Sequence, residues 1–95
     1  MDTQEILRQY ATGRRNFRKQ DLRSLVLTHA NLNGADFTGA NLSGSDLNNS
    51  DLTNVNLNWT NLKGVNLSGT SLKGAKMPDG NLHNDFLESA NYFGI

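Results

Sequence analysis

The chain has 95 residues, enough for one small domain, and its hydrophobic fraction of 36% is low for a conventional globular core. It contains no cysteine, which excludes disulfides and thiolate metal sites. The formal net charge is zero, but residues 1–23 carry six Lys and Arg against three Asp and Glu, so the N-terminal end is basic. No stretch resembles a signal peptide or an apolar membrane span, and we therefore expect a cytoplasmic protein without membrane attachment.

Residues 3–12 are predicted to form a helix. Asp2, three residues before Glu5, resembles an N-capping arrangement. Ile6, Leu7 and Tyr10 then fall on one side of the helix, which is expected to end near Gly13. We assign residues 1–14 to a capping helix and its linker, and residues 15–95 to a second segment. Binding to a membrane surface is the alternative for the helix, but its apolar face is short.

From residue 17 onward an apolar side chain recurs at every fifth position. The sixteen positions are Phe17, Leu22, Leu27, Leu32, Phe37, Leu42, Leu47, Leu52, Leu57, Leu62, Leu67, Leu72, Met77, Leu82, Leu87 and Tyr92. A mostly small residue precedes each by two positions, and Asn or Asp usually lies between them. An internal repeat of this kind decides the fold.

A five-residue period suits neither a helix nor a straight strand. In an α-helix each step would rotate the apolar residue by about 140°, and in a strand alternate residues would face solvent. Three extended residues followed by a two-residue corner bury every small and apolar position together. Corners suit the residues that tolerate positive φ, which here are Gly34, Gly39, Gly44, Gly64, Gly69, Gly74, Asn49 and Asn54. The sequence therefore predicts an all-β solenoid in which each coil hydrogen-bonds to the next, with three or four sides.

The pattern Ala-(Asp/Asn)-Leu-X-X resembles the pentapeptide-repeat family over about residues 15–94. This resemblance implies a right-handed quadrilateral β-helix with four repeats per 20-residue coil, hence about four coils. The helix expected over residues 3–12 would then be an N-terminal α-helical cap on the first coil. The segments LRQYATGRRNF and KMPDGNLH are similar to segments of cyanobacterial members. A 20-residue register would stack Asp21, Asn41, Asn61 and Asn81 on one face.

The C-terminal end is less regular than the body of the repeat. Pro78, Asp79 and Gly80 predict a distorted corner. The last residues either form a cap of their own or mediate end-to-end dimerisation, as in some family members. The residues expected at this cap or dimer contact are Phe86, Tyr92, Phe93 and Ile95.

The sequence offers no arrangement suited to catalysis. His29 and His83 are the only histidines and fall on different faces, too far apart to share a metal or a proton. No histidine and carboxylate accompany a serine or threonine, and the glycines match no phosphate loop. We expect no catalytic, cofactor or metal site, and no enzyme.

Two surface features are candidate binding sites for a partner. Trp59 occupies a corner position where Gly or Asn is usual, and exposed tryptophans are enriched at interaction hot spots. The alternative is that its ring packs over neighbouring corner atoms. Arg23, Lys63 and His83 are expected in one face column that could meet an acidic partner, or simply be solvated.

The functional prediction is a non-enzymatic scaffold or protein-interaction module with an unidentified partner. Some relatives mimic DNA and regulate DNA gyrase, which requires a long acidic surface. Here residues 24–95 carry three Lys against only six Asp and Glu, so this alternative is weaker. Direct binding of nucleic acid rests only on the basic N-terminal end, which lacks an aromatic platform.

Overall fold

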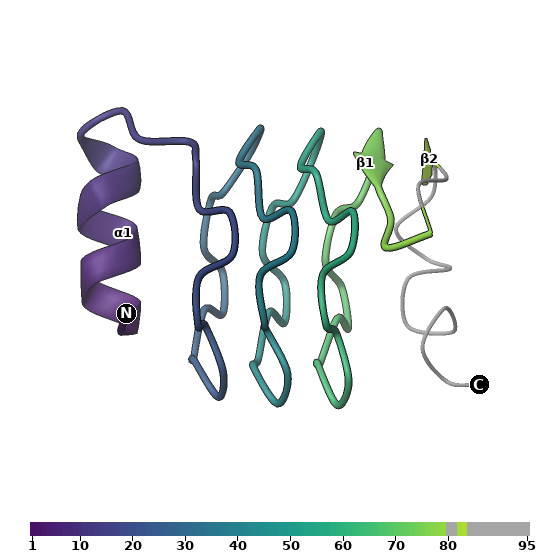
Figure 1. The fold of residues 1–95 in the computed structure, drawn as a ribbon, viewed down its shortest axis with the longest axis horizontal. Helices are drawn as coiled ribbons and strands as arrows, with labels where there is room; N and C mark the ends of the chain where they lie inside the picture. The colour runs from purple at the N-terminus through teal and green to yellow at the C-terminus, as the bar shows by residue number, and fades with distance from the viewer. Residues whose placement is uncertain (80–81, 84–95) are drawn as a thin grey trace.

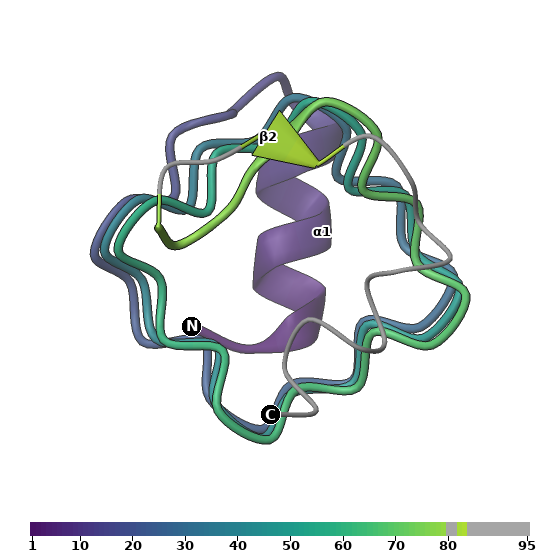
Figure 2. The ribbon, with the colours of Figure 1, turned by 90° about the vertical axis from the view of Figure 1, so that its right-hand side faces the viewer.

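The protein is a short shaft of stacked coils with a helix across one end. A computed structural model describes residues 1–79 and 82–83. Its elements are the helix α1 (Thr3–Ala11) and the two-residue strands β1 (Ala75–Lys76) and β2 (Leu82–His83) (Figure 1). Along the shaft axis the coils superpose into a four-cornered outline, and α1 crosses it (Figure 2). The helix expected over residues 3–12 is present and one residue shorter.

Parallel bridges between residues 20 apart set the register of the coils. They join Asn16 to Asp36, Asp21 to Asn41, Val26 to Asp46 and Asn31 to Asp51, and continue in the same register to Lys76. Across each bridge the backbone bonds alternate: the Leu22 N–H donates to the Asn41 carbonyl at 2.8 Å, and the Asn41 N–H donates to the Gln20 carbonyl at 3.0 Å. Because each coil of 20 residues makes four such bridges, it has four sides. The five-residue period alone had left three or four sides open.

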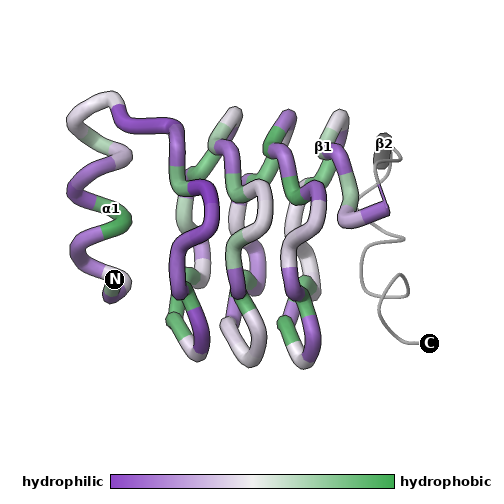
Figure 3. Tube along the Cα trace, viewed as in Figure 1, coloured by the Kyte–Doolittle hydropathy of each residue, from purple (hydrophilic) through white to green (hydrophobic). Residues whose placement is uncertain are grey.

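The repeated apolar side chains form one continuous column of core inside the shaft. All thirteen from Phe17 to Met77 are buried, with at most 4% of their surface exposed. The rings of Phe17 and Phe37 stack with their centroids 5.7 Å apart. Hydropathy alternates along each coil accordingly (Figure 3). Full burial of each such side chain stabilises the fold by about 1.5–3 kcal/mol, so the column is the main source of stability.

Hydroxyl groups at four of the small inward positions are fully satisfied. The hydroxyls of Ser45, Thr60 and Thr70 donate to carbonyls of the preceding coil, at Leu22, Phe37 and Leu47 respectively. Ser50 donates to the Leu47 carbonyl at 2.7 Å. Within the described ranges no buried side-chain N or O atom lacks a partner. Ser45, Thr60 and Thr70 therefore tie neighbouring coils together, and Ser50 is satisfied within its own coil.

The outward Asn and Asp side chains shape the backbone as well as meeting solvent. Asp36, Asn41 and Asp46 each accept a hydrogen bond from the backbone N–H two residues later, at 3.0 Å in all three cases. The same contact recurs at Asp51, Asn56, Asn61 and Asn66. Such Asx turns hold the chain in the bend that leads into each corner. This role explains why the repeat prefers Asn or Asp at a position that only needs to be polar.

The cap is locked to the first coil by apolar and polar contacts. Ile6 is fully buried and joins the core column, and the Tyr10 hydroxyl donates to the Asn33 carbonyl at 2.7 Å. The expected N-cap is confirmed, because Asp2 accepts from the Glu5 N–H at 2.8 Å. Glu5 also accepts from Arg8 and from Gln9.

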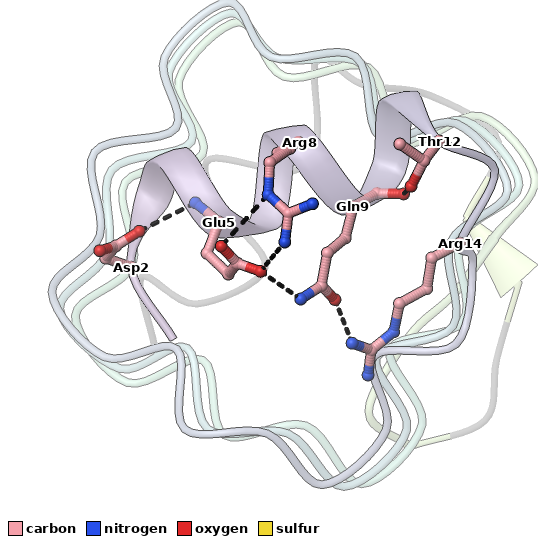
Figure 4. Close-up of polar contacts among 6 residues, drawn as sticks. All are labelled: Asp2, Glu5, Arg8, Gln9, Thr12 and Arg14. Atoms are coloured by element: carbon pink, nitrogen blue, oxygen red, sulfur yellow. Dashed lines mark hydrogen bonds and ion pairs between the residues drawn. The ribbon is translucent and has the colours of Figure 1, made fainter.

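Two arginines of the basic end contribute to the same lock. Arg14 donates to the Gln9 side chain (Figure 4) and to the Asn16 carbonyl, and its guanidinium lies 4.8 Å from the centroid of the Phe17 ring. Arg15 lies 3.6 Å from the centroid of the Tyr10 ring. Part of the N-terminal positive charge therefore serves the fold.

The register is kept as far as Pro78, whose carbonyl accepts the Trp59 N–H, and it changes after that residue. The backbone of β2 pairs antiparallel with β1, so that His83 lies opposite Ala75 and Leu82 opposite Lys76. The expected column of Arg23, Lys63 and His83 is thus wrong for His83. The physical reason lies in the preceding corner: Pro78 has no N–H to donate, and Lys76 replaces the Asn or Asp that would accept it. The expected contacts of Phe86, Tyr92, Phe93 and Ile95 lie outside the described residues.

Candidate interaction surface

The corners of the coils require positive φ, and four of them are occupied by unexpected residues. The predicted Gly and Asn corners are confirmed, with φ between +58° and +75°. Lys19, Ser24, His29 and Trp59 adopt the same conformation. The left-handed region costs an L-residue about 1–2 kcal/mol relative to glycine. A bulky residue with positive φ is unusual, and the corner geometry alone gives no reason for it. Such strained residues cluster at functional sites.

Trp59 combines this backbone strain with solvent exposure. Its φ is +62° and 77% of its surface is exposed. The Trp59 N–H donates to the Pro78 carbonyl at 3.3 Å, which any residue other than proline could do. The ring is therefore largely in solvent rather than packed over the corner, and folding gains little from it.

The corner column of Trp59 also contains Lys19, Gly39 and Asp79. The next coil toward the N-terminus has Gly39 at this corner, with no side chain beside the tryptophan. The Lys19 side chain fills the space, because its Cγ is 3.3 Å from the point where a Cβ on Gly39 would stand. The stem of Lys19 thus lies against the Gly39 corner of the neighbouring coil.

Arg23 and Lys63 lie in one column, as expected, with Ser43 between them, but their charges are used differently. The Ser24 N–H donates to the Ser43 carbonyl and the Gly44 N–H to the Lys63 carbonyl, which fixes the column. Arg23 folds back on Asp21 and donates two hydrogen bonds of 2.8 Å to its carboxylate. Lys63 is exposed, and its ammonium group has no ion-pair partner among residues 1–79.

The Arg23 pair changes the titration of Asp21. The Arg23 guanidinium, helped by the backbone N–H of the same residue, lowers the pKa of the Asp21 carboxyl to about 2. The carboxylate in turn raises the pKa of Arg23. Met1, Asp21, Arg23 and Ser24 line a surface hollow of about 360 Å³ between the N-terminus and the first coil. Arg23 therefore forms an exposed ion pair at the edge of this hollow and is not a free cation.

Asp21→Asn is expected to lower the melting temperature at pH 7 by a small amount and to have a much smaller effect near pH 2. The folded pKa of about 2 lies below the value of about 3.9 in an unfolded chain. The carboxylate therefore stabilises the fold fully above about pH 4, and this contribution is lost as the pH falls toward 2. Melting curves of both proteins at the two pH values provide the test.

Asp51→Asn is the matched control, since Asp51 contacts no arginine in the described part of the chain. An equal loss for Asp21→Asn at pH 2 and pH 7 would show that the ion pair is not the cause.

The described residues contain no group of three potential metal ligands. Within residues 1–79 and 82–83 no three His, Asp or Glu side chains gather as metal ligands. His29 is exposed at a corner. Among the same residues, no helix has the length and apolar character needed to cross a membrane. What the surface does present is an exposed aromatic residue in the same corner column as Lys19.

A four-sided coil with an Asx turn and a positive-φ corner in each five-residue unit defines a class of repeat proteins. The sequence profile of pentapeptide repeats matches residues 16–49 and 50–84 in eight copies. The chain belongs to the pentapeptide-repeat family, whose members form right-handed quadrilateral β-helices. No catalytic family matches, and among curated proteins there is no match.

Solved structures of cyanobacterial pentapeptide-repeat proteins resemble this chain. One from Cyanothece 51142 is 31% identical, with a TM-score of 0.50, over 59% of this chain and 42% of its own. HetL from Nostoc, involved in regulating heterocyst differentiation, is 35% identical, with a TM-score of 0.28, over 72% of this chain and 38% of its own. A third, also from Nostoc, is 26% identical, with a TM-score of 0.45, over 94% and 93% of the two chains. The chain thus spans less than half the length of the first two.

Proposed function

We propose that this right-handed quadrilateral β-helix, capped by α1, is a non-enzymatic protein-interaction module that binds its partner through the Trp59 corner. The observation that carries the proposal is the exposure of 77% of Trp59 on a backbone with φ of +62°. The positive φ destabilises the fold, and the exposed side chain contributes little to it. A role in binding therefore accounts for Trp59 better than a role in stabilising the shaft. The described interior, by contrast, is filled by packed apolar side chains.

Replacing Trp59 by Asn should separate binding from folding. Asn occupies the same corner position at Asn49 and Asn54 with similar φ, so the shaft should tolerate it. We expect Trp59→Asn to melt at or above the wild-type temperature, with a gain of up to about 1 kcal/mol. In a pull-down from native lysate of the source organism, the variant should lose a protein that the wild type retains.

His29→Asn is the matched control for this experiment. His29 is exposed at a corner with φ of +58°, in the column two corners away from that of Trp59. It should therefore retain the same partner as the wild type. Equal retention by the wild type and Trp59→Asn, or failure of both to retain any specific protein, would remove the support for this proposal.

DNA mimicry has less support from the described residues. Asp36, Asp46 and Asp51 lie on three faces of one coil, so they form a belt and not a line along the shaft. Their bridged neighbours in the coils before and after are Asn16, Asn56, Val26, Asn66, Asn31 and Ser71, none of which is acidic. A supercoiling assay in which the protein inhibits or protects gyrase would revive this alternative.

A further inference from the structure

The two faces that meet at the Trp59 corner are the basic part of the shaft. Over residues 15–79 these faces carry Arg15, Arg18, Lys19, Arg23, Lys63 and Lys76 against Asp21, Asp36 and Asp79. The other two faces carry Lys73 against Asp46 and Asp51. The first pair therefore has a net charge of +3 and the second pair −1. Trp59 thus lies at the most positive corner, although the whole chain is neutral.

Several of these cations are available to a ligand. Among residues 1–79, no ion pair or side-chain hydrogen bond engages the charged groups of Arg18, Lys19 or Lys63. Arg23, by contrast, is neutralised by Asp21. Lys19 and Trp59 belong to the same corner column, and the Lys19 stem lies against Gly39, which stands between them in that column.

From this juxtaposition we propose that the Trp59 corner binds an acidic, partly apolar extended segment of a partner protein. The inference rests on the proposed interaction function and adds the chemistry of the partner. Unpaired cations select carboxylates, and the exposed indole supplies the apolar contact that makes a binding hot spot.

The spacing of the corner predicts a pattern in that segment. Lys19 and Trp59 are two coils apart, which is about 10 Å along the shaft at the usual strand spacing. An extended peptide rises about 3.3 Å per residue, so an acid facing Lys19 and an apolar residue facing Trp59 should be separated by about three positions.

A nucleic-acid strand fits this corner less well. A single indole could stack on one base, but a continuous phosphate backbone would also meet Asp36 on the adjoining face. A peptide can place its acids only where the cations are. The proposal therefore commits to a protein segment and leaves single-stranded nucleic acid as an outcome of the test.

The first arm of the test selects binding peptides directly. A phage-displayed random dodecapeptide library is panned on the full chain after depletion on Trp59→Asn, with His29→Asn as the matched control target. We expect enriched peptides to contain Asp or Glu about three positions from an aliphatic or aromatic residue, and to bind His29→Asn as well as the wild type.

The second arm measures binding of the most enriched peptide and of oligo(dT) by fluorescence of Trp59, the only tryptophan in the chain. The Lys19→Ser, Lys63→Ser double variant should bind the peptide at least about tenfold more weakly, and added salt should weaken the wild type. Binding to Trp59→Asn, followed with a labelled peptide, should fall by a similar factor.

The outcomes separate this inference from the proposed function. Trp59-dependent peptides that are neutral or basic would overturn the acidic partner but leave an interaction module. Absence of any Trp59-dependent peptide, without quenching by oligo(dT), would overturn both. Quenching of Trp59 by oligo(dT), without binding of acidic peptides, would overturn the protein partner in favour of nucleic acid.

Discussion

Leu57→Asp is expected to unfold the shaft. Leu57 is fully buried in the core column, between Phe37 and Met77 in the register of the coils. The substitution removes about 1.5–3 kcal/mol of apolar burial and places a carboxylate where no partner can reach it. The sum approaches the whole stability of a domain of this size, which is typically about 5–15 kcal/mol. Circular dichroism should show loss of the native spectrum and of a cooperative melting transition.

Asn61→Asp is the matched control for Leu57→Asp. It adds the same charge four residues later, at an exposed outward position, where the new carboxylate can still accept the Lys63 N–H. Its bridged neighbour Asn41 is uncharged, so no like-charge contact arises. We expect its melting temperature to remain close to that of the wild type. A folded Leu57→Asp protein with wild-type melting would contradict the inward register.

Ile6→Asp is expected to detach the cap and cause self-association. Ile6 is the fully buried side chain of α1 and packs against the end of the core column. Without the helix, Phe17 and Leu22 would be uncovered, together with backbone groups of the first coil that no earlier coil pairs. Open ends of this kind aggregate edge to edge. Light scattering over a range of concentrations should show species larger than those of the wild type.

Gln4→Asp tests whether the charge alone produces this effect. Gln4 is exposed in the first turn of α1, where a carboxylate is compatible with the helix dipole. It should leave the size distribution unchanged. If Ile6→Asp matched Gln4→Asp in both size and melting, α1 would not be needed to close the end.

The repeat made most of the fold predictable because each unit is decided locally. A five-residue period admits only a chain that bends in every unit, and the Gly and Asn corners follow from the positive φ of that bend. The inward positions follow in the same way, and all thirteen described ones are buried. The sequence analysis did not predict the Asx turns, in which an outward Asn or Asp side chain accepts the backbone N–H two residues later. The regular Asn or Asp in each repeat is a signal from which they could have been predicted.

The candidate surface was only partly predictable, because contacts between units decide it. Trp59 could be placed at a corner from its position in the repeat, but not its exposure or the course of Lys19 over Gly39. Arg23 appeared in the sequence as a cation of the surface column, and the structure shows it bonded to Asp21. His83 was expected in that column, and the antiparallel pairing of β1 and β2 places its backbone opposite Ala75.

The sequence by itself determined the solenoid, its inward and outward positions, its corners and the helix at its start. These features depend on residues within a few positions of one another, where spacing and φ preference are sufficient. Only the tertiary structure decided the four-sided closure, the partners of the basic residues and the departure from register at Pro78. Those depend on which side chains meet across coils 20 residues apart and at the two ends, where no single repeat contains the information.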